Sequence, residues 1–237
     1  MEQSSQHTLA QPRRLSLTIS RVAAEATTPQ PSLAPLEEFA VTVTVRKDAE
    51  IHAQGDRALY CYRIVSGCVR SVKLMEDGRR QINEFLLPGD WFGFEALEAH
   101  DVAAEAVSEA VLRRYPRRAC DALAAEDVRI TSWLLTLATG HLRSARDRMV
   151  ALGRKTASER IAGFLLEMAK RMPQDRVGTV ALPMSRGDIA DHLGLTIETV
   201  CRCLAQLRRD GTIGLTRTSL AVRQRPALEA LADATRH

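Results

Sequence analysis

The fold is decided by residues 185–209, which read SRGDIADHLGLTIETVCRCLAQLRR. Ser185 followed three positions later by Asp188 forms a capping box, which predicts that a short helix begins directly after the serine. Gly194 can adopt positive φ without steric cost, and Thr196 is a favoured N-cap, so a tight turn and a second helix should follow. Two helices joined by a short turn that contains glycine are typical of a helix-turn-helix.

The flanking residues complete a larger C-terminal unit. A helix is predicted over 157–171 and an extended stretch over 179–182, before the two helices of the turn motif. Gly211 and Gly214 predict a hairpin after the second helix. This order of elements indicates a winged helix-turn-helix, to which we assign residues 154–237.

The second helix of the motif separates apolar from polar positions. Its expected buried face, at i, i+3, i+4 and i+7, consists of Val200, Cys203, Leu204 and Leu207. Its outer face consists of Glu198, Cys201, Arg202, Ala205, Arg208 and Arg209. An arginine can bind O6 and N7 of guanine, and a carboxylate can accept a hydrogen bond from N4 of cytosine. We therefore expect Glu198 and Arg202 to contact DNA bases beside Thr199 and Cys201, although an i,i+4 pair of opposite charge also occurs on ordinary helix surfaces.

Further polar residues are candidates for the DNA backbone. Thr196 supplies a hydroxyl at the start of the helix, and the candidate cations are Lys155, Arg186, Arg208 and Arg217, each of which could instead be a solvated surface charge. Residues 153–237 carry 14 Lys and Arg against 9 Asp and Glu, whereas residues 1–152 carry 19 against 20. A basic region of this kind is the electrostatic footprint of a protein that neutralises phosphates, so double-stranded DNA is the expected partner.

The N-terminal half has strand periodicity instead. Short β-branched or alternating runs occupy residues 41–45, 60–65, 68–74, 81–87 and 110–115, with glycine-containing turns between them. This pattern predicts an antiparallel β-roll, or jelly roll, which we assign to residues 36–125. Residues 1–35 are rich in Ser, Thr, Gln, Pro and Ala and are expected to form a disordered tail.

A long helix is expected to connect the two halves, over residues 126–153, which makes the fold class α+β. Its apolar positions predict one continuous stripe, formed by Ile130, Leu134, Leu137, His141, Ala145, Met149 and Leu152. A helix of this length spans more than about 30 Å, which one small barrel cannot cover. We therefore expect the stripe to pack against a second copy in a homodimer, with His141 hydrogen-bonded at the interface rather than bound to a metal.

From residue 38 to residue 225 the chain resembles the CRP/FNR transcription regulators. The segments Gly55-Asp56, Gly67, Gly78 and Pro88-Gly89-Asp90 are similar to the glycine-spaced β-roll of that family, and residues 197–202 resemble the Glu-x-x-Ser-Arg motif of its FNR branch. Residues 87–96 and 104–107 are similar to the FixK group, regulators of oxygen-limited metabolism. The resemblance implies a homodimeric activator that binds a TTGA-N6-TCAA-like palindrome and recruits RNA polymerase. Glu198 and Arg202 would contact the half-site, and Cys201 stands where that motif has serine.

The residues do not suit the ligand chemistries of this family. An iron-sulfur cluster needs four thiolates, three of them close together near the N-terminus, but the first cysteine is Cys61. Val102-Ala103 occupy the place where a cyclic-nucleotide cassette has an Arg-Ser pair, and neither residue can pair with a phosphate. His52 and His100 are expected to be isolated surface or turn residues. We therefore predict no cofactor and no metal.

Three alternatives differ from a ligand-independent regulator. The β-roll of a ligand-responsive regulator would bind haem or an unidentified small molecule. A cupin-type enzyme would need clustered histidines and a carboxylate inside the barrel, which the sequence lacks, so no enzymatic activity is expected. A scaffold dimer that does not bind DNA would not need an outward Glu198 and Arg202.

The five cysteines, at positions 61, 68, 120, 201 and 203, are too scattered for a disulfide framework and fit a reducing compartment. No apolar run approaches the roughly 18 residues of a membrane-spanning helix, so we expect a cytoplasmic protein without a membrane partner. Cys203 is predicted to be an inert core residue, whereas Cys201 should be exposed near Arg202 and a helix N-terminus. One hypothesis is that oxidation of Cys201 weakens DNA binding, and the other is that Cys201 only replaces serine as a small polar contact.

Overall fold

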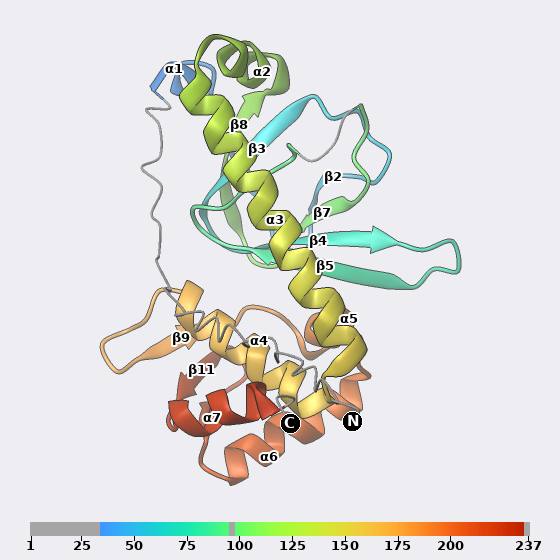
Figure 1. Cartoon of the computed structure of the whole chain (residues 1–237), viewed down its shortest axis with the longest axis vertical. Helices are drawn as coiled ribbons and strands as arrows, with labels where there is room; N and C mark the ends of the chain where they lie inside the picture. The colour runs from blue at the N-terminus through green and yellow to red at the C-terminus, as the bar shows by residue number, and fades with distance from the viewer. Residues whose placement is uncertain (1–33, 95–97, 235–237) are drawn as a thin grey trace, which may run out of the picture. The chain divides into compact units, whose positions relative to one another are not determined.

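Two four-stranded antiparallel sheets form the N-terminal β-roll of the computed structural model, which describes residues 34–94 and 98–234 (Figure 1). The first sheet has the order β1 (Val41–Val45), β8 (Ala110–Pro116), β3 (Tyr60–Ser66) and β6 (Trp91–Phe92). The second has the order β2 (Glu50–His52), β7 (Ala103–Ala106), β4 (Val69–Leu74) and β5 (Arg80–Leu86). The predicted α+β fold class is confirmed. The tail predicted for residues 1–35 lies outside the described residues except for its last two, which begin α1 (Ala34–Glu37).

One turn of the β-roll requires glycine. Gly67, between β3 and β4, has φ +87°, and a Cβ at this position would lie 2.3 Å from the carbonyl oxygen of Glu109. Both the left-handed backbone and the close approach of the neighbouring chain exclude a side chain here.

Two helices follow the β-roll, α2 (Arg117–Glu126) and α3 (Val128–Arg154), and α3 continues past the roll toward the C-terminal unit (Figure 1). The carboxylate of Asp127 caps α3 by accepting a hydrogen bond from the backbone N–H of Arg129 at 2.8 Å. Near this end, Trp133 packs edge-on against Trp91 of the β-roll, with ring centroids 5.1 Å apart. No helix of the described ranges is long and apolar enough to cross a membrane.

The first residues of the stripe predicted on α3 are covered by their own chain while its last residues are exposed, which corrects the predicted role of Ile130 as a dimer contact. Ile130 is buried in its own chain, and Leu134 and Leu137 pack against the same intrachain cluster. From Leu137 to Met149 the predicted stripe takes three successive four-residue steps, each about 40° beyond a full helical turn, so Met149 lies about 120° around the helix from Leu137. The exposed residues that keep a strict heptad spacing instead are Leu135, Ala138, Leu142, Ala145, Met149 and Leu152, which we call the α3 seam.

The C-terminal unit is a winged helix-turn-helix (Figure 1). Its helices are α4 (Ala157–Arg171), α5 (Arg186–Leu193), α6 (Ile197–Arg209) and α7 (Arg225–Ala232). Its small sheet has the order β10 (Ile213–Leu215), β11 (Ser219–Val222) and β9 (Thr179–Ala181). Gly211 ends α6 with φ +70° and Gly214 lies inside β10, so the tip of the hairpin falls at residues 216–218 and not at either glycine.

Two histidines of the β-roll also differ from the prediction. His52 and His100 are buried, and their rings stack with centroids 3.6 Å apart, next to Tyr62 and Phe92. Pairing of β2 with β7 brings together two segments that are far apart in sequence, which the sequence pattern did not indicate. Burial, and secondarily the neighbouring His100, lowers the pKa of His52 to about 4, so this imidazole is neutral at pH 7.

Candidate nucleic-acid interface

The turn between α5 and α6 is built by local hydrogen bonds. The Asp188 backbone N–H donates to Ser185 Oγ at 3.0 Å, and Asp188 Oδ2 accepts from the Ser185 backbone N–H at 2.9 Å. Gly194 adopts the left-handed conformation with φ 61° and ψ 46°. Thr196 then caps α6, with its Oγ1 accepting from the Thr199 backbone N–H at 3.2 Å. The predicted capping box, glycine turn and N-cap are confirmed.

One face of α6 is buried in the C-terminal unit, as predicted. Val200, Leu204 and Leu207 are buried, whereas Cys203 is only partly buried, with its sulfur 3.6 Å from Ser158 Oγ. Cys203, predicted to be a core residue, therefore packs against the core from its edge.

The opposite face of α6 is exposed to solvent. Its exposed residues are Glu198, Cys201, Arg202, Arg208 and Arg209, while Thr199 is partly buried. Backbone and Thr196 hydrogen bonds hold the pKa of Glu198 below its usual value. Arg202 Nη2 donates a long hydrogen bond to Thr199 Oγ1, at 3.5 Å. Within the described part of the chain no ion pair joins Glu198 to Arg202, so neither charge is neutralised by the other.

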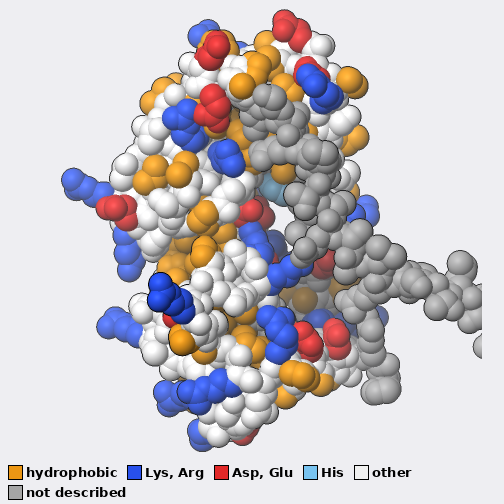
Figure 2. Space-filling model, turned by 90° about the vertical axis from the view of Figure 1, so that its left-hand side faces the viewer, with side chains coloured by type: hydrophobic (Ala, Val, Ile, Leu, Met, Phe, Trp, Pro, Cys, Tyr) orange, Lys and Arg blue, Asp and Glu red, His pale blue; other side chains and the backbone are white. Residues whose placement is uncertain are grey.

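The candidate backbone cations differ in their surroundings. Arg208 and Arg217 are exposed, and Arg217 lies at the tip of the β10–β11 hairpin. Arg186 is partly buried and donates to the Thr216 carbonyl oxygen at 3.3 Å. The Lys155 ammonium donates to the Ala232 carbonyl oxygen at 2.8 Å, so one of its three donors is already used inside the protein. Several Lys and Arg side chains lie over the lower part of the face shown in Figure 2, which belongs to the winged helix-turn-helix.

The sequence reasoning missed a set of residues that hold α5. Arg70 and Arg80 of the β-roll form ion pairs with α5, more than one hundred positions along the chain. No sequence motif marks these arginines, because an ion pair between distant elements leaves no periodic pattern.

An antiparallel β-roll, a long helix and a winged helix-turn-helix with an outward acid and arginine define a DNA-binding transcription regulator. Residues 42–127 match the family model described as a cyclic nucleotide-binding domain, and residues 159–231 match the Crp-like helix-turn-helix domain. The chain belongs to the CRP/FNR family of transcription regulators, as predicted, and is similar to its FixK members.

The nitrogen fixation regulation protein FixK of Azorhizobium caulinodans is 46% identical over 189 residues, which cover 78% of this chain and 76% of that protein. FixK of Rhizobium meliloti is 41% identical, with 77% and 82% covered. The solved structure of FixK2 from Bradyrhizobium japonicum is similar with a TM-score of 0.77 and 46% identity, over 81% of this chain and 96% of that one.

The start of β7, where the phosphate-binding pair of a cyclic-nucleotide cassette would be expected from the sequence, has two apolar residues. At the start of β7, Ala103 is fully buried and the preceding residue is Val102. Neither side chain can donate a hydrogen bond to a phosphate oxygen. At this point of β7 the chain therefore offers a phosphate no side-chain hydrogen-bond donor.

Proposed function

We propose that this protein is a homodimeric activator of oxygen-limited metabolism that binds a TTGA-N6-TCAA-like palindrome and recruits RNA polymerase. The observation that carries the proposal is the free face of α6, where Glu198 and Arg202 are exposed in the first two turns and are not paired with each other. The similarity to nitrogen fixation regulation proteins supports the physiological assignment.

The chemistry of α6 suits this half-site. A TTGA half-site contains one G·C pair, and an arginine and a carboxylate together can contact that pair, through O6 and N7 of guanine and N4 of cytosine. Arg202 and Glu198 lie one helical turn apart near the N-terminus of α6, the end of a recognition helix that contacts base edges. Arg186, Arg208 and Arg217, together with Lys155 and Thr196, would contact the backbone.

A palindrome requires two copies of the protein, and the second copy would pack against the α3 seam. Leu142 and Met149 are 50% and 73% exposed, and they lie seven positions apart in the heptad that defines the seam. Packed against its equivalent in a second chain, such a seam would form a two-helix coiled coil. Half-sites separated by one helical turn of B-DNA, about 34 Å, require two recognition helices held in a fixed relation, which a dimer provides.

Binding to DNA duplexes tests the role of α6. The Arg202→Ala variant should bind the palindrome about 1 to 3 kcal/mol more weakly in fluorescence anisotropy, with a smaller loss on a random duplex. Arg209→Ala, which removes an exposed arginine from the last turn of the same helix, is the control and should change both duplexes alike. Equal losses of Arg202→Ala on both duplexes would contradict base contact by this residue.

The dimer is tested separately by sedimentation. Leu142→Glu places a carboxylate in the α3 seam and should yield monomers, whereas Arg143→Glu, at the exposed neighbouring position, should leave the dimer intact. A Leu142→Glu protein that sediments like the wild type would show that the seam is not the interface.

The exposure of Cys201 beside Arg202 supports redox control of DNA binding. The Cys201 thiolate would attack one oxygen of a peroxide, and the O–O bond of the peroxide would break. The products are a sulfenic acid at Cys201 and an alcohol or water. Peroxide should then weaken binding of the palindrome by wild type and by Cys203→Ser, but not by Cys201→Ser. If Cys201→Ser loses affinity as the wild type does, Cys201 acts only as a small polar contact.

A further inference from the structure

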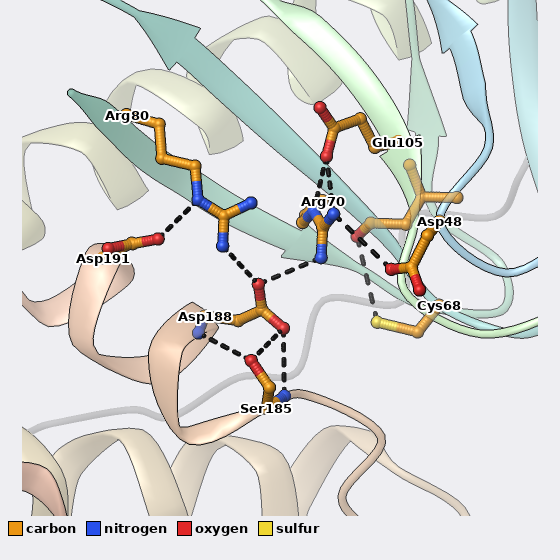
Figure 3. A network of polar contacts seen from close by, with 9 residues as sticks. Asp48, Cys68, Arg70, Arg80, Glu105, Ser185, Asp188 and Asp191 are labelled. Atoms are coloured by element: carbon orange, nitrogen blue, oxygen red, sulfur yellow. Dashed lines mark hydrogen bonds and ion pairs between the residues drawn. The ribbon is translucent and has the colours of Figure 1, made fainter. Parts of the chain in front are cut away.

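One carboxylate on α5 has two structural roles. Asp188 Oδ2 belongs to the capping box and accepts hydrogen bonds from the backbone and the hydroxyl of Ser185 (Figure 3). Asp188 Oδ1 faces the β-roll, where it is 2.9 Å from Arg70 Nη1 of β4 and 3.0 Å from Arg80 Nη2 of β5. The group that fixes the start of α5 is therefore also the group that ties α5 to the β-roll.

Further contacts hold the same face of α5. Arg80 Nε lies 2.6 Å from Asp191 Oδ2 (Figure 3). Gln81 Nε2 donates to the His192 carbonyl oxygen at 3.3 Å. The His192 ring nitrogen Nδ1 is 3.1 Å from the Ile82 carbonyl oxygen. We call this set of contacts between β4, β5 and α5 the α5 clamp.

Burial makes the clamp difficult to open. The side chains of Arg70 and Asp188 are only 9% and 5% exposed, and Arg70 also pairs with Glu105 at 2.7 Å. Removing one partner of a buried ion pair leaves an uncompensated charge, which is strongly destabilising. Apolar residues of the β-roll and of the C-terminal unit belong to one core cluster. The α5 clamp therefore lies beside a packed apolar interface.

The clamp limits the orientation of α6. Only residues 194–196 separate α5 from α6, so a rotation of α5 moves α6 with it. The covalent link from α3 to α4 passes through two residues outside helices, 155 and 156, and by itself would allow rotation. The base-contacting face of α6 is exposed while α5 is clamped, so the clamp does not occlude DNA.

We propose that Arg70 and Arg80 are positioning residues for DNA binding, which make the protein selective for the spacing between the two halves of the palindrome. This inference rests on the proposed function. With the clamp closed, the two α6 helices of a dimer keep one separation, and a palindrome of matching spacer binds without reorganisation. With the clamp open, each C-terminal unit samples several orientations, which weakens binding to the matched site and admits other spacers.

The variant Arg80→Glu tests the clamp because the side chain of Arg80 is 35% exposed, so the change is less disruptive than one at Arg70. It places a carboxylate next to Asp188 and Asp191. Arg79→Glu is the matched control, since Arg79 is 77% exposed and pairs with Asp77 of its own turn. Adding Asp191→Arg to Arg80→Glu restores an opposite-charge pair at the same place.

Affinities for duplexes with spacers of five, six and seven base pairs are measured by anisotropy. The wild type and Arg79→Glu should prefer one spacer. Arg80→Glu should bind that duplex about tenfold more weakly and should lose most of the spacer preference. Adding Asp191→Arg to Arg80→Glu should restore both the affinity and the preference. Amide exchange should rise in α5 and β5 of Arg80→Glu and not in α6, which distinguishes an opened clamp from an unfolded domain. If amide exchange in α6 also rises, the affinities are measured with Arg80→Gln in place of Arg80→Glu. Arg80→Gln should show a smaller loss of affinity and of spacer preference, in the same direction.

An Arg80 variant with wild-type affinity and spacer preference would overturn the inference while leaving the proposed function in place. The same holds for an Arg80→Glu protein that differs from Arg79→Glu in neither measurement. A wild type that does not prefer any palindrome over a random duplex would overturn both.

Discussion

Acidification should destabilise this protein through a histidine buried on α5. His192 is 8% exposed, its ring packs against Phe85 and Phe164 at centroid distances of 5.1 and 5.8 Å, and its pKa is lowered to about 4. Burial is the main cause of the low pKa, and the nearby Arg148 of α3 adds to it, while Glu167 of α4 acts in the opposite direction.

The sign of the effect follows from proton binding. Between pH 6.5 and 4 the unfolded chain binds a proton at His192 and the folded protein does not, so the free energy of unfolding falls as the pH falls through this window. A histidine that titrates near 6.5 when unfolded and about 4 when folded gives a loss of about 2 kcal/mol from pH 7 to pH 5. His52 adds a loss of the same sign, because burial lowers its pKa as well.

Urea unfolding of wild type and His192→Gln at pH 7 and pH 5, at one protein concentration, measures this contribution. Glutamine can donate to the Ile82 carbonyl oxygen but does not titrate, so the variant should lose about 2 kcal/mol less than the wild type between the two pH values. Ser144→Gln, a change at an exposed position of α3 that does not titrate, should lose as much as the wild type. The reasoning is refuted if His192→Gln shows the full pH dependence.

Three further outcomes are expected from the structure. Arg217→Ala should weaken binding to all duplexes alike and reduce the slope of log affinity against log salt by about 1, as measured by a salt titration of anisotropy. Gly67→Ala should lower the free energy of unfolding by several kcal/mol, because its Cβ would meet the Glu109 carbonyl oxygen. Gly78, with φ +81°, has open space around it, so Gly78→Ala should lower the free energy of unfolding by about 1 kcal/mol. Similar losses for the two variants would contradict the contact with Glu109. In thermal unfolding, Ile130→Ala should cost about 2 to 5 kcal/mol, and Val128→Ala, at a position 76% exposed, should be nearly neutral.

Strands with β-branched or alternating sequences were predictable from the chain. The run at residues 41–45 is β1, and that at 60–65 lies within β3. In contrast, β7 has the sequence AAEA, which favours helix by intrinsic propensity. It forms a strand because its backbone pairs with β2 and β4 while its alanine side chains are buried, and this tertiary contact overrides the local preference.

The candidate DNA-binding face was predictable in the same way, because α6 has a buried and a free side that follow from its 3.6-residue period. The exposed apolar face of α3, proposed as the dimer interface, was not. Periodicity shows which residues of α3 share a side, but the β-roll covers one of those sides near Ile130 and leaves the seam around Leu142 open.

The caps, turns and helix faces were thus determined by the amino-acid sequence, because each depends on residues within a few positions of one another, as in Ser185 with Asp188. The tertiary structure alone decided which side of α3 is covered, how His52 meets His100, and that Arg70 binds Asp188 across 118 positions. These contacts depend on the separation of elements in space, and local periodicity carries no information about that separation.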